Sequence, residues 1–251
     1  MNFKILLVFF ALLSSHAFAR NKGHLVAKKL EKANNGFIGE SGIMKLVLID
    51  AYGTKIVREM EGKTLEVVGD GDKSLSIFLN PKDVKGTKML TWSHKLKDND
   101  QWLYLPSLRR VKRISSKNKS ASFMGSEFTY EDLGSQEIEK YSHRLINENK
   151  KQWVLERVPK DHSGYSKQIS WISKKINNPT KVEYYDRKNE LLKVAKFSKF
   201  KRYKVAGKTL YRPGKIHMKN VQTKKESIFS WANRKVGKKF PANEFKKAAL
   251  K

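Results

Sequence analysis

The feature that most constrains the fold of this chain is a long succession of strand-like segments with no helical crossover between them. From Gly42 to Lys235, about a dozen segments alternate apolar and polar residues. Turn residues separate them, and the Gly-Asp-Gly-Asp run at Gly69–Asp72 is a strong hairpin signal. Because no helices return the chain, consecutive strands should pair antiparallel. The pattern predicts a mainly β protein with a single large antiparallel sheet curved into a barrel or half-barrel.

Three segments depart from this alternation. His24–Asn34 has the pattern of a short amphipathic helix that stops at Asn35 and Gly36, and Pro241–Leu250 predicts a short terminal helix. In the middle, the polar run Ser115–Ser122 precedes Phe123–Leu133, whose apolar spacing suits a short helix or irregular flap better than a strand.

The first residues resemble an export signal. Lys4 precedes the apolar run Ile5–Leu13, and Ala17-Phe18-Ala19 places small residues at the positions of a cleavage site. The run is too short to span a bilayer as a helix. We therefore expect residues 1–19 to be a signal peptide and residues 20–251 to form one domain, exported to the periplasm, with full secretion as the second possibility.

The chain has no cysteine, which narrows its class. A lipoprotein signal needs a cysteine to carry the lipid, so the product is not expected to be lipid-anchored. No disulfide can support the fold of this exported chain, and a hydrophobic core must therefore hold it together.

The charge of the chain is strongly positive. It has 53 Lys and Arg against 24 Asp and Glu, a formal net charge of +29. Such a surface attracts anionic partners. Nucleic acid would be the first candidate in a cytosol, but behind an export signal we expect transient contact with an anionic membrane and no nucleic-acid partner. A general abundance of Lys in the proteins of this organism would explain the same composition.

No catalytic site emerges from the sequence. The histidines are scattered without metal-ligand spacing. Gly164–Gln168 lacks the final glycine of a nucleophile elbow, and the glycines at Gly69–Asp72 lie between strands, where a dinucleotide loop does not occur. We expect no catalytic residue, no metal and no cofactor.

Apolar residues give the positive signal. Their alternation on successive strands is expected to bring one set to a concave face as a ligand cavity: Met44, Leu46, Leu48, Leu75, Ile77, Leu79, Trp92, Trp102 and Tyr104. The irregular segment would cover that cavity as a lid with Phe123, Met124, Phe128, Tyr130 and Leu133. The alternative is that these aromatic residues simply close one end of the core.

A basic cluster adjoins the lid segment. Arg109, Arg110, Lys112 and Arg113 cannot all point into an apolar interior, because an unpaired buried charge costs several kcal/mol. Alternation places Arg109 and Arg113 opposite Arg110 and Lys112. We expect this cluster to dock on a membrane or partner, with a merely solvated strand face as the alternative.

Two long runs carry a family resemblance. Residues 98–114, DNDQWLYLPSLRRVKRI, and 119–133, KSASFMGSEFTYEDL, closely resemble the outer-membrane lipoprotein-sorting, LolA-like family, in its larger divergent branch. Shorter matches follow in order over most of the chain, at Gly164–Lys167, Tyr184–Asp186 with Leu191–Lys193, and Asn220–Thr223.

The resemblance implies an open antiparallel half-barrel with short lid helices and a hydrophobic cavity for acyl chains. Carriers of this family take lipoproteins from an inner-membrane ABC exporter and pass them to an outer-membrane receptor, and this branch often accompanies RND-type exporters. The implied function is a non-enzymatic periplasmic carrier of a lipid or acylated protein, with an inner-membrane exporter and an outer-membrane acceptor as partners. The alternatives are an accessory periplasmic subunit that binds an exporter rather than cargo, and an enzyme acting on lipids or glycans.

Overall fold

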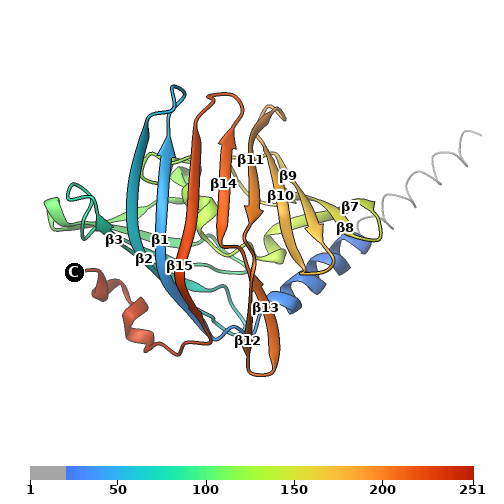
Figure 1. Ribbon diagram of the computed structural model, residues 1–251, viewed down its shortest axis with the longest axis horizontal. Helices are drawn as coiled ribbons and strands as arrows, with labels where there is room; N and C mark the ends of the chain where they lie inside the picture. Colours follow the sequence, from blue (N-terminus) through green and yellow to red (C-terminus); the bar gives the residue numbers. More distant parts are fainter. Residues whose placement is uncertain (1–20) are drawn as a thin grey trace, which may run out of the picture.

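The computed structural model describes residues 21–251, so the predicted signal peptide, residues 1–19, lies outside the described residues. An antiparallel sheet of thirteen strands dominates the fold, in the order β6-β5-β4-β3-β2-β1-β15-β14-β11-β10-β9-β8-β7 (Figure 1). The sheet does not close, because β6 and β7 are its two free edges. The described residues form fifteen strands, of which β12 and β13 lie outside this sheet. They are β1 Gly39–Ile49, β2 Lys55–Leu65, β3 Lys73–Asn80, β4 Lys88–Trp92, β5 Asp100–Leu105, β6 Arg110–Ile114, β7 Tyr141–Glu148, β8 Gln152–Pro159, β9 Lys167–Ser173, β10 Asn178–Tyr185, β11 Leu191–Ser198, β12 Lys201–Val205, β13 Lys208–Arg212, β14 Lys215–Asn220 and β15 Glu226–Val236.

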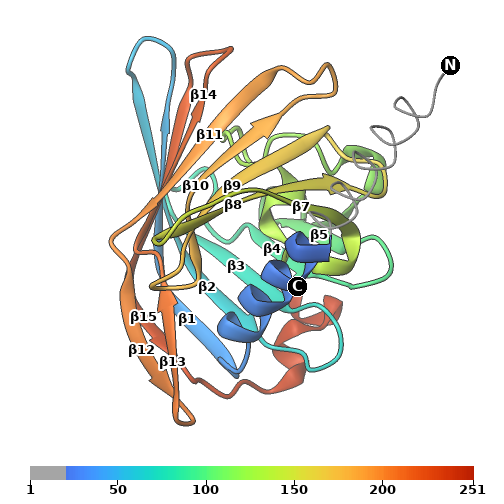
Figure 2. The ribbon, with the colours of Figure 1, turned by 90° about the vertical axis from the view of Figure 1, so that its right-hand side faces the viewer.

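The sheet consists of two meanders joined at its centre. β1 to β6 extend from the centre to one edge, and β15, β14 and β11 to β7 extend to the other. The two halves join where β1 pairs with β15, for example Leu46 with Phe229. The link between β6 and β7, residues 115–140, therefore has to connect opposite edges of the sheet. It does so across the concave side (Figure 2). This topology explains why the lid segment breaks the strand pattern.

A helix at residues 21–34 lies on the same concave side (Figure 2). Its apolar stripe buries Val26 and Ala27 against Trp153, Leu155 and Ile172 on β8 and β9. The predicted stop is confirmed: the helix ends at residue 34, and Gly36 follows with a φ of +86°. None of the helices in residues 21–251 is long and apolar enough to cross a membrane.

The remaining helical segments are short. They are 3-10 helices at Pro106–Leu108, Ser116–Asn118, Tyr130–Leu133, Ile138–Lys140, Ala242–Phe245 and Lys247–Leu250. The last two replace the terminal helix that the sequence predicts.

After β10 the chain forms more and shorter strands than the alternation of apolar and polar residues predicts. The chain leaves the main sheet after Ser198, at Lys199 with a φ of +54°, and β12 and β13 form a separate hairpin. It returns as β14.

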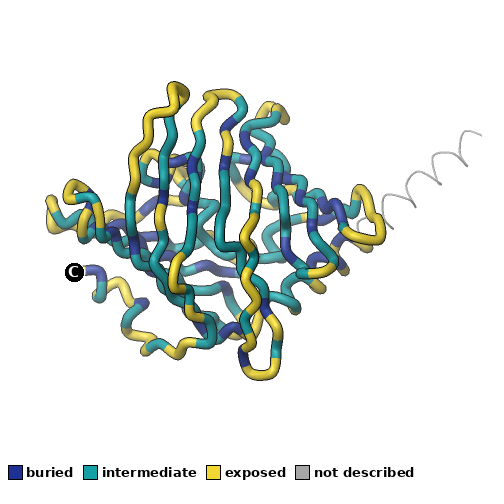
Figure 3. Tube along the Cα trace, in the orientation of Figure 1, coloured by how far each residue is buried: buried dark blue, intermediate teal, exposed yellow. Residues whose placement is uncertain are grey.

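Both faces of the sheet carry a core. The larger cluster lies on the concave side, where strand residues such as Leu46, Met60 and Phe78 pack against the lid segment. A second cluster on the opposite face packs strand residues against the C-terminal segment, through Phe245 and Leu250. Figure 3 shows buried stretches across the middle of the sheet and exposed residues at the hairpin tips.

Candidate functional site

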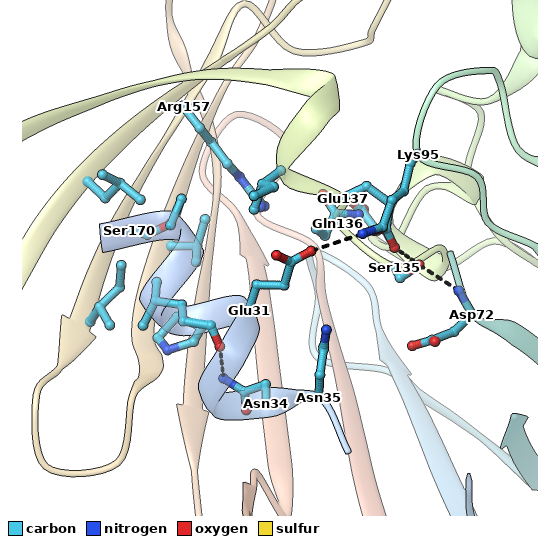
Figure 4. A pocket seen from close by; sticks show the side chains of 18 of the residues that line it. Glu31, Asn34, Asn35, Asp72, Lys95, Ser135, Gln136, Glu137, Arg157 and Ser170 are labelled. Carbon is cyan, nitrogen blue, oxygen red and sulfur yellow. Dashed lines mark hydrogen bonds and ion pairs between the residues drawn. The ribbon is translucent and has the colours of Figure 1, made fainter. Parts of the chain in front are cut away.

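A cavity of about 520 Å³ lies between the N-terminal helix and the concave face of β8, β9, β10, β11 and β14 (Figure 4). The helix contributes Ala27 and Leu30 to its wall. The strands contribute an apolar floor that includes Leu155, Ile172, Val182, Phe197, Ile216 and Met218. Volumes of about 300 to 1,000 Å³ with a mostly apolar lining are typical of small-molecule sites.

One end of this floor is polar. Successive strands place one polar side chain each at paired positions, so that a row runs across the sheet through His143, Arg157, Gln168, Tyr184, Lys193 and Asn220. Two residues further along the same strands, the next row contains Leu155, Ser170, Val182, Ala195 and Met218. Because residues two apart share a face, the concave surface changes from polar to apolar along the strands.

A buried ion pair fastens the lid segment to this row. The Lys193 ammonium lies 2.8 Å from an Asp132 carboxylate oxygen and donates to the Glu127 carbonyl at 2.8 Å. The two side chains are only 2% and 7% exposed. The Tyr165 hydroxyl also donates to Asp132 at 3.0 Å, and burial raises the pKa of Tyr165. Asp132 further accepts the Thr129 backbone N–H at 2.8 Å, which caps the 3-10 helix.

A smaller cavity of about 230 Å³ lies on the other half of the concave face, bordered by residues of β1 to β4 and β15. Phe128 and Asp132 of the lid segment border both cavities. All five predicted lid residues pack in the concave core: Phe123, Met124, Phe128, Tyr130 and Leu133. Whether this segment opens to admit cargo stays a prediction.

The predicted cavity residues divide between the two faces of the sheet. Met44, Leu46 and Leu48 lie on the concave face, and Met44 borders the smaller cavity. Six others do not, and their predicted place in the cavity is wrong. Five of them pack in the cluster covered by the C-terminal segment, and Leu79 shares their side of β3: Leu75, Ile77, Leu79, Trp92, Trp102 and Tyr104.

The reason for the error is that β3 to β5 bury apolar residues on both faces, one in the concave core and one against the C-terminal segment. Ser74 and Ser76 face the smaller cavity, which turns Leu75 and Ile77 to the opposite side. There the C-terminal segment covers them, and the Trp92 indole donates to the Phe245 carbonyl at 2.7 Å. Alternation shows which residues share a face, but it does not show which face is concave.

Sequence reasoning also missed the principal cavity walls. The N-terminal helix was predicted, but it was not expected to line a cavity. None of the predicted cavity residues lies on the strands from β8 to β14. The available signal was the apolar stripe Val26, Ala27 and Leu30 on the helix, which requires an apolar partner.

The basic cluster lies on and beside β6, at a free edge of the sheet. Arg109, Arg110, Lys112 and Arg113 are all exposed. Arg113 donates to Asp100 at 2.6 Å. Charged residues also protect an edge strand from unwanted pairing, and docking by this cluster stays a prediction.

Carboxylates gather at the side of the large cavity near the helix C-terminus. Glu31, Glu137 and Glu139 could converge on a metal ion, since one oxygen of each lies within 4.8 Å of the others. The ammonium of Lys95 already lies 3.4 Å from Glu31 and 3.6 Å from Glu139, however, and supplies a cation there. Burial raises the pKa of nearby Asp72 to about 7, and the charges of Glu137 and Glu66 add to this rise.

Comparisons with known proteins identify the family. A solved domain from Vibrio parahaemolyticus, described as an outer membrane lipoprotein-sorting protein, is 43% identical, with a TM-score of 0.88 over 92% of this chain and 99% of that one. This chain belongs to the outer-membrane lipoprotein-sorting, LolA-like family. The family that the sequence resembles is thus confirmed, as is its open half-barrel.

Further relatives extend the similarity of the LolA-like fold. A DUF1329 family protein from Desulfovibrio piger is 25% identical, with a TM-score of 0.85 over 93% of this chain and 99% of that one. A LolA superfamily protein from Nitrosomonas europaea shares the fold at 18% identity, with a TM-score of 0.70 over 90% of this chain and 98% of that one. A family model described as an uncharacterized protein matches residues 70–251. A comparison with curated proteins gives no match.

Proposed function

We propose that this protein is a periplasmic carrier that binds the acyl chains of a lipid or lipoprotein in the cavity beneath the N-terminal helix. The observation that carries the proposal is the apolar cavity of about 520 Å³ between that helix and the sheet. The description of the Vibrio relative as a lipoprotein-sorting protein supports the class of cargo. The predicted export signal supports the compartment.

The energetics suit reversible transport. Each buried methylene contributes about 0.8 kcal/mol, so ten of them contribute about 8 kcal/mol before the costs of association. Exchange would require the helix or the lid segment to move, and we propose that an inner-membrane exporter of the ABC or RND type loads the carrier and an outer-membrane acceptor unloads it. The apolar lining favours cargo binding over catalysis.

Native mass spectrometry of protein purified from its own periplasm tests this proposal. We expect adducts with the mass of a lipid or an acylated peptide. Leu30→Trp should fill the cavity and abolish them, because Leu30 lines it. Leu25→Trp is the matched control, since Leu25 is 59% exposed on the same helix. Protein that is always empty, or adducts that survive Leu30→Trp, would contradict the proposal and favour an accessory subunit.

A further inference from the structure

Arg157 on β8 is a cation without a carboxylate partner among residues 21–251. Its Nε donates to the Gln168 side-chain oxygen at 2.7 Å, and its guanidinium carbon lies 4.9 Å from the centre of the Tyr141 ring. No Asp or Glu of the described chain forms an ion pair with it. Figure 4 shows the side chain reaching from β8 into the large cavity. The Gln168 bond fixes its direction and leaves its terminal N–H groups free to donate.

The other cations beside this cavity have counter-charges. Lys193 pairs with Asp132, and Lys95 pairs with Glu31. Asp70 contacts His94 at 2.8 Å. Arg157 therefore differs from these cations by having no counter-charge. The carboxylates of Glu66, Asp72 and Glu137, which also line the wall, form no ion pair within residues 21–251 either.

Two neutral polar side chains lie near Arg157 on the neighbouring strands β7 and β9. His143, its cross-strand neighbour on β7, is 7% exposed, and its Nδ1 is buried without a hydrogen-bond partner. Burial and the charge of Arg157 lower the pKa of His143 to about 4, so the ring is neutral near pH 7. Ser170 on β9 is 8% exposed and lines the same cavity. A buried polar group without a partner is costly, which points to a partner supplied by a ligand.

We propose that Arg157, with His143 and Ser170, binds the anionic head group of an amphiphile whose acyl chain lies in the cavity. The shared chemistry is one carboxylate or phosphate that accepts hydrogen bonds from the guanidinium. The chain would extend from the polar row over the apolar rows of β8 to β14. The carboxylates near Lys95, at another part of the cavity wall, disfavour the reverse orientation (Figure 4). This inference rests on the proposed carrier function and adds selectivity for anionic cargo.

Displacement of an apolar fluorescent dye from the delipidated protein tests the proposal with three probes of one chain length. These are palmitate, palmitoyl-lysophosphatidate and neutral monopalmitoylglycerol. We expect the protein to bind at least one anionic probe about tenfold or more tighter than the neutral probe, as for a charge-assisted hydrogen bond. Preference for palmitate alone assigns a carboxylate, preference for lysophosphatidate alone assigns a phosphate, and preference for both assigns a site that accepts either anion.

Variants identify the residue responsible. Arg157→Gln should remove the preference and leave affinity for the neutral probe unchanged, which also shows that the cavity is folded. Arg157→Lys should retain part of the preference. Arg202→Gln, the same charge change at an exposed position on β12, should have no effect.

Equal binding of all three probes by the unmodified protein would overturn the head-group site and leave the carrier function intact. Anionic preference that survives Arg157→Gln would do the same. Binding of no probe would overturn both.

Discussion

Replacing Lys193 by Met tests how firmly the lid segment is held. The change removes the ammonium that contacts the Asp132 carboxylate and the Glu127 carbonyl, each at 2.8 Å. The same ammonium lies 5.0 Å from the centre of the Tyr165 ring and 5.2 Å from that of Tyr184. Breaking a buried ion pair from one side costs about 3 to 5 kcal/mol, because a charge remains buried without compensation. Asp132 keeps two other hydrogen-bond donors, so we expect about 3 kcal/mol.

The double variant Lys193→Met with Asp132→Asn separates the orphaned charge from lost packing. Since it removes both charges, we expect it to cost only about 1 kcal/mol, which is about 2 kcal/mol less than Lys193→Met alone. Urea unfolding measures the free energy, and hydrogen exchange should show faster opening of residues 123–133 in the single variant.

Lys219→Met is the matched control. Lys219 also pairs with a carboxylate, Glu226, at 3.1 Å, but its side chain is 54% exposed. Surface pairs contribute about 0 to 1 kcal/mol. A loss below 1 kcal/mol for Lys193→Met, with unchanged exchange in the lid segment, would refute the reasoning that this pair anchors the lid.

Three further changes test other parts of the structure. Asp72→Asn should leave stability unchanged near pH 4 and raise it by about 2 to 4 kcal/mol at pH 8 in urea unfolding, because a pKa raised from 3.8 to about 7 makes folding less favourable as pH rises between those values. Gly23→Ala should lower stability by about 1 to 3 kcal/mol and weaken dye binding, since a Cβ would lie 2.7 Å from the Leu145 backbone N and push the helix away. Phe245→Ala should cost about 3 to 5 kcal/mol in urea unfolding but leave lipid affinity unchanged, because Phe245 packs on the face opposite the cavities. Each argument would be contradicted by a variant whose free energy of unfolding is unchanged: Asp72→Asn at pH 8, Gly23→Ala, or Phe245→Ala.

Much of the fold was predictable because its signals are local. The hairpin signal at Gly69–Asp72 lies in the connection between β2 and β3, and the helix stop at Asn35 and Gly36 is where the sequence places it. The two runs that carry the family resemblance, residues 98–114 and 119–133, were not needed for these predictions, since alternation and turn residues act within a few positions. The family resemblance was also available from the sequence, and the comparison with the Vibrio domain confirms it.

The site was less predictable because it depends on contacts between distant segments. Which face of β3 carries the cavity depends on the direction of sheet curvature and on the C-terminal segment that covers Leu75 and Trp92. The exception is the lid segment, whose broken pattern already indicated that it leaves the sheet.

The sequence by itself determined that this chain forms one large antiparallel sheet with an interrupted middle, because strand periodicity and turn chemistry are properties of neighbouring residues. Only the tertiary structure decided where the cavity lies. His143, Arg157 and Lys193 belong to separate strands, and the pairing register alone aligns them into one polar row. A shift of one residue in any of these strands would turn its side chain to the other face, so the site exists only once the whole half-sheet is assembled.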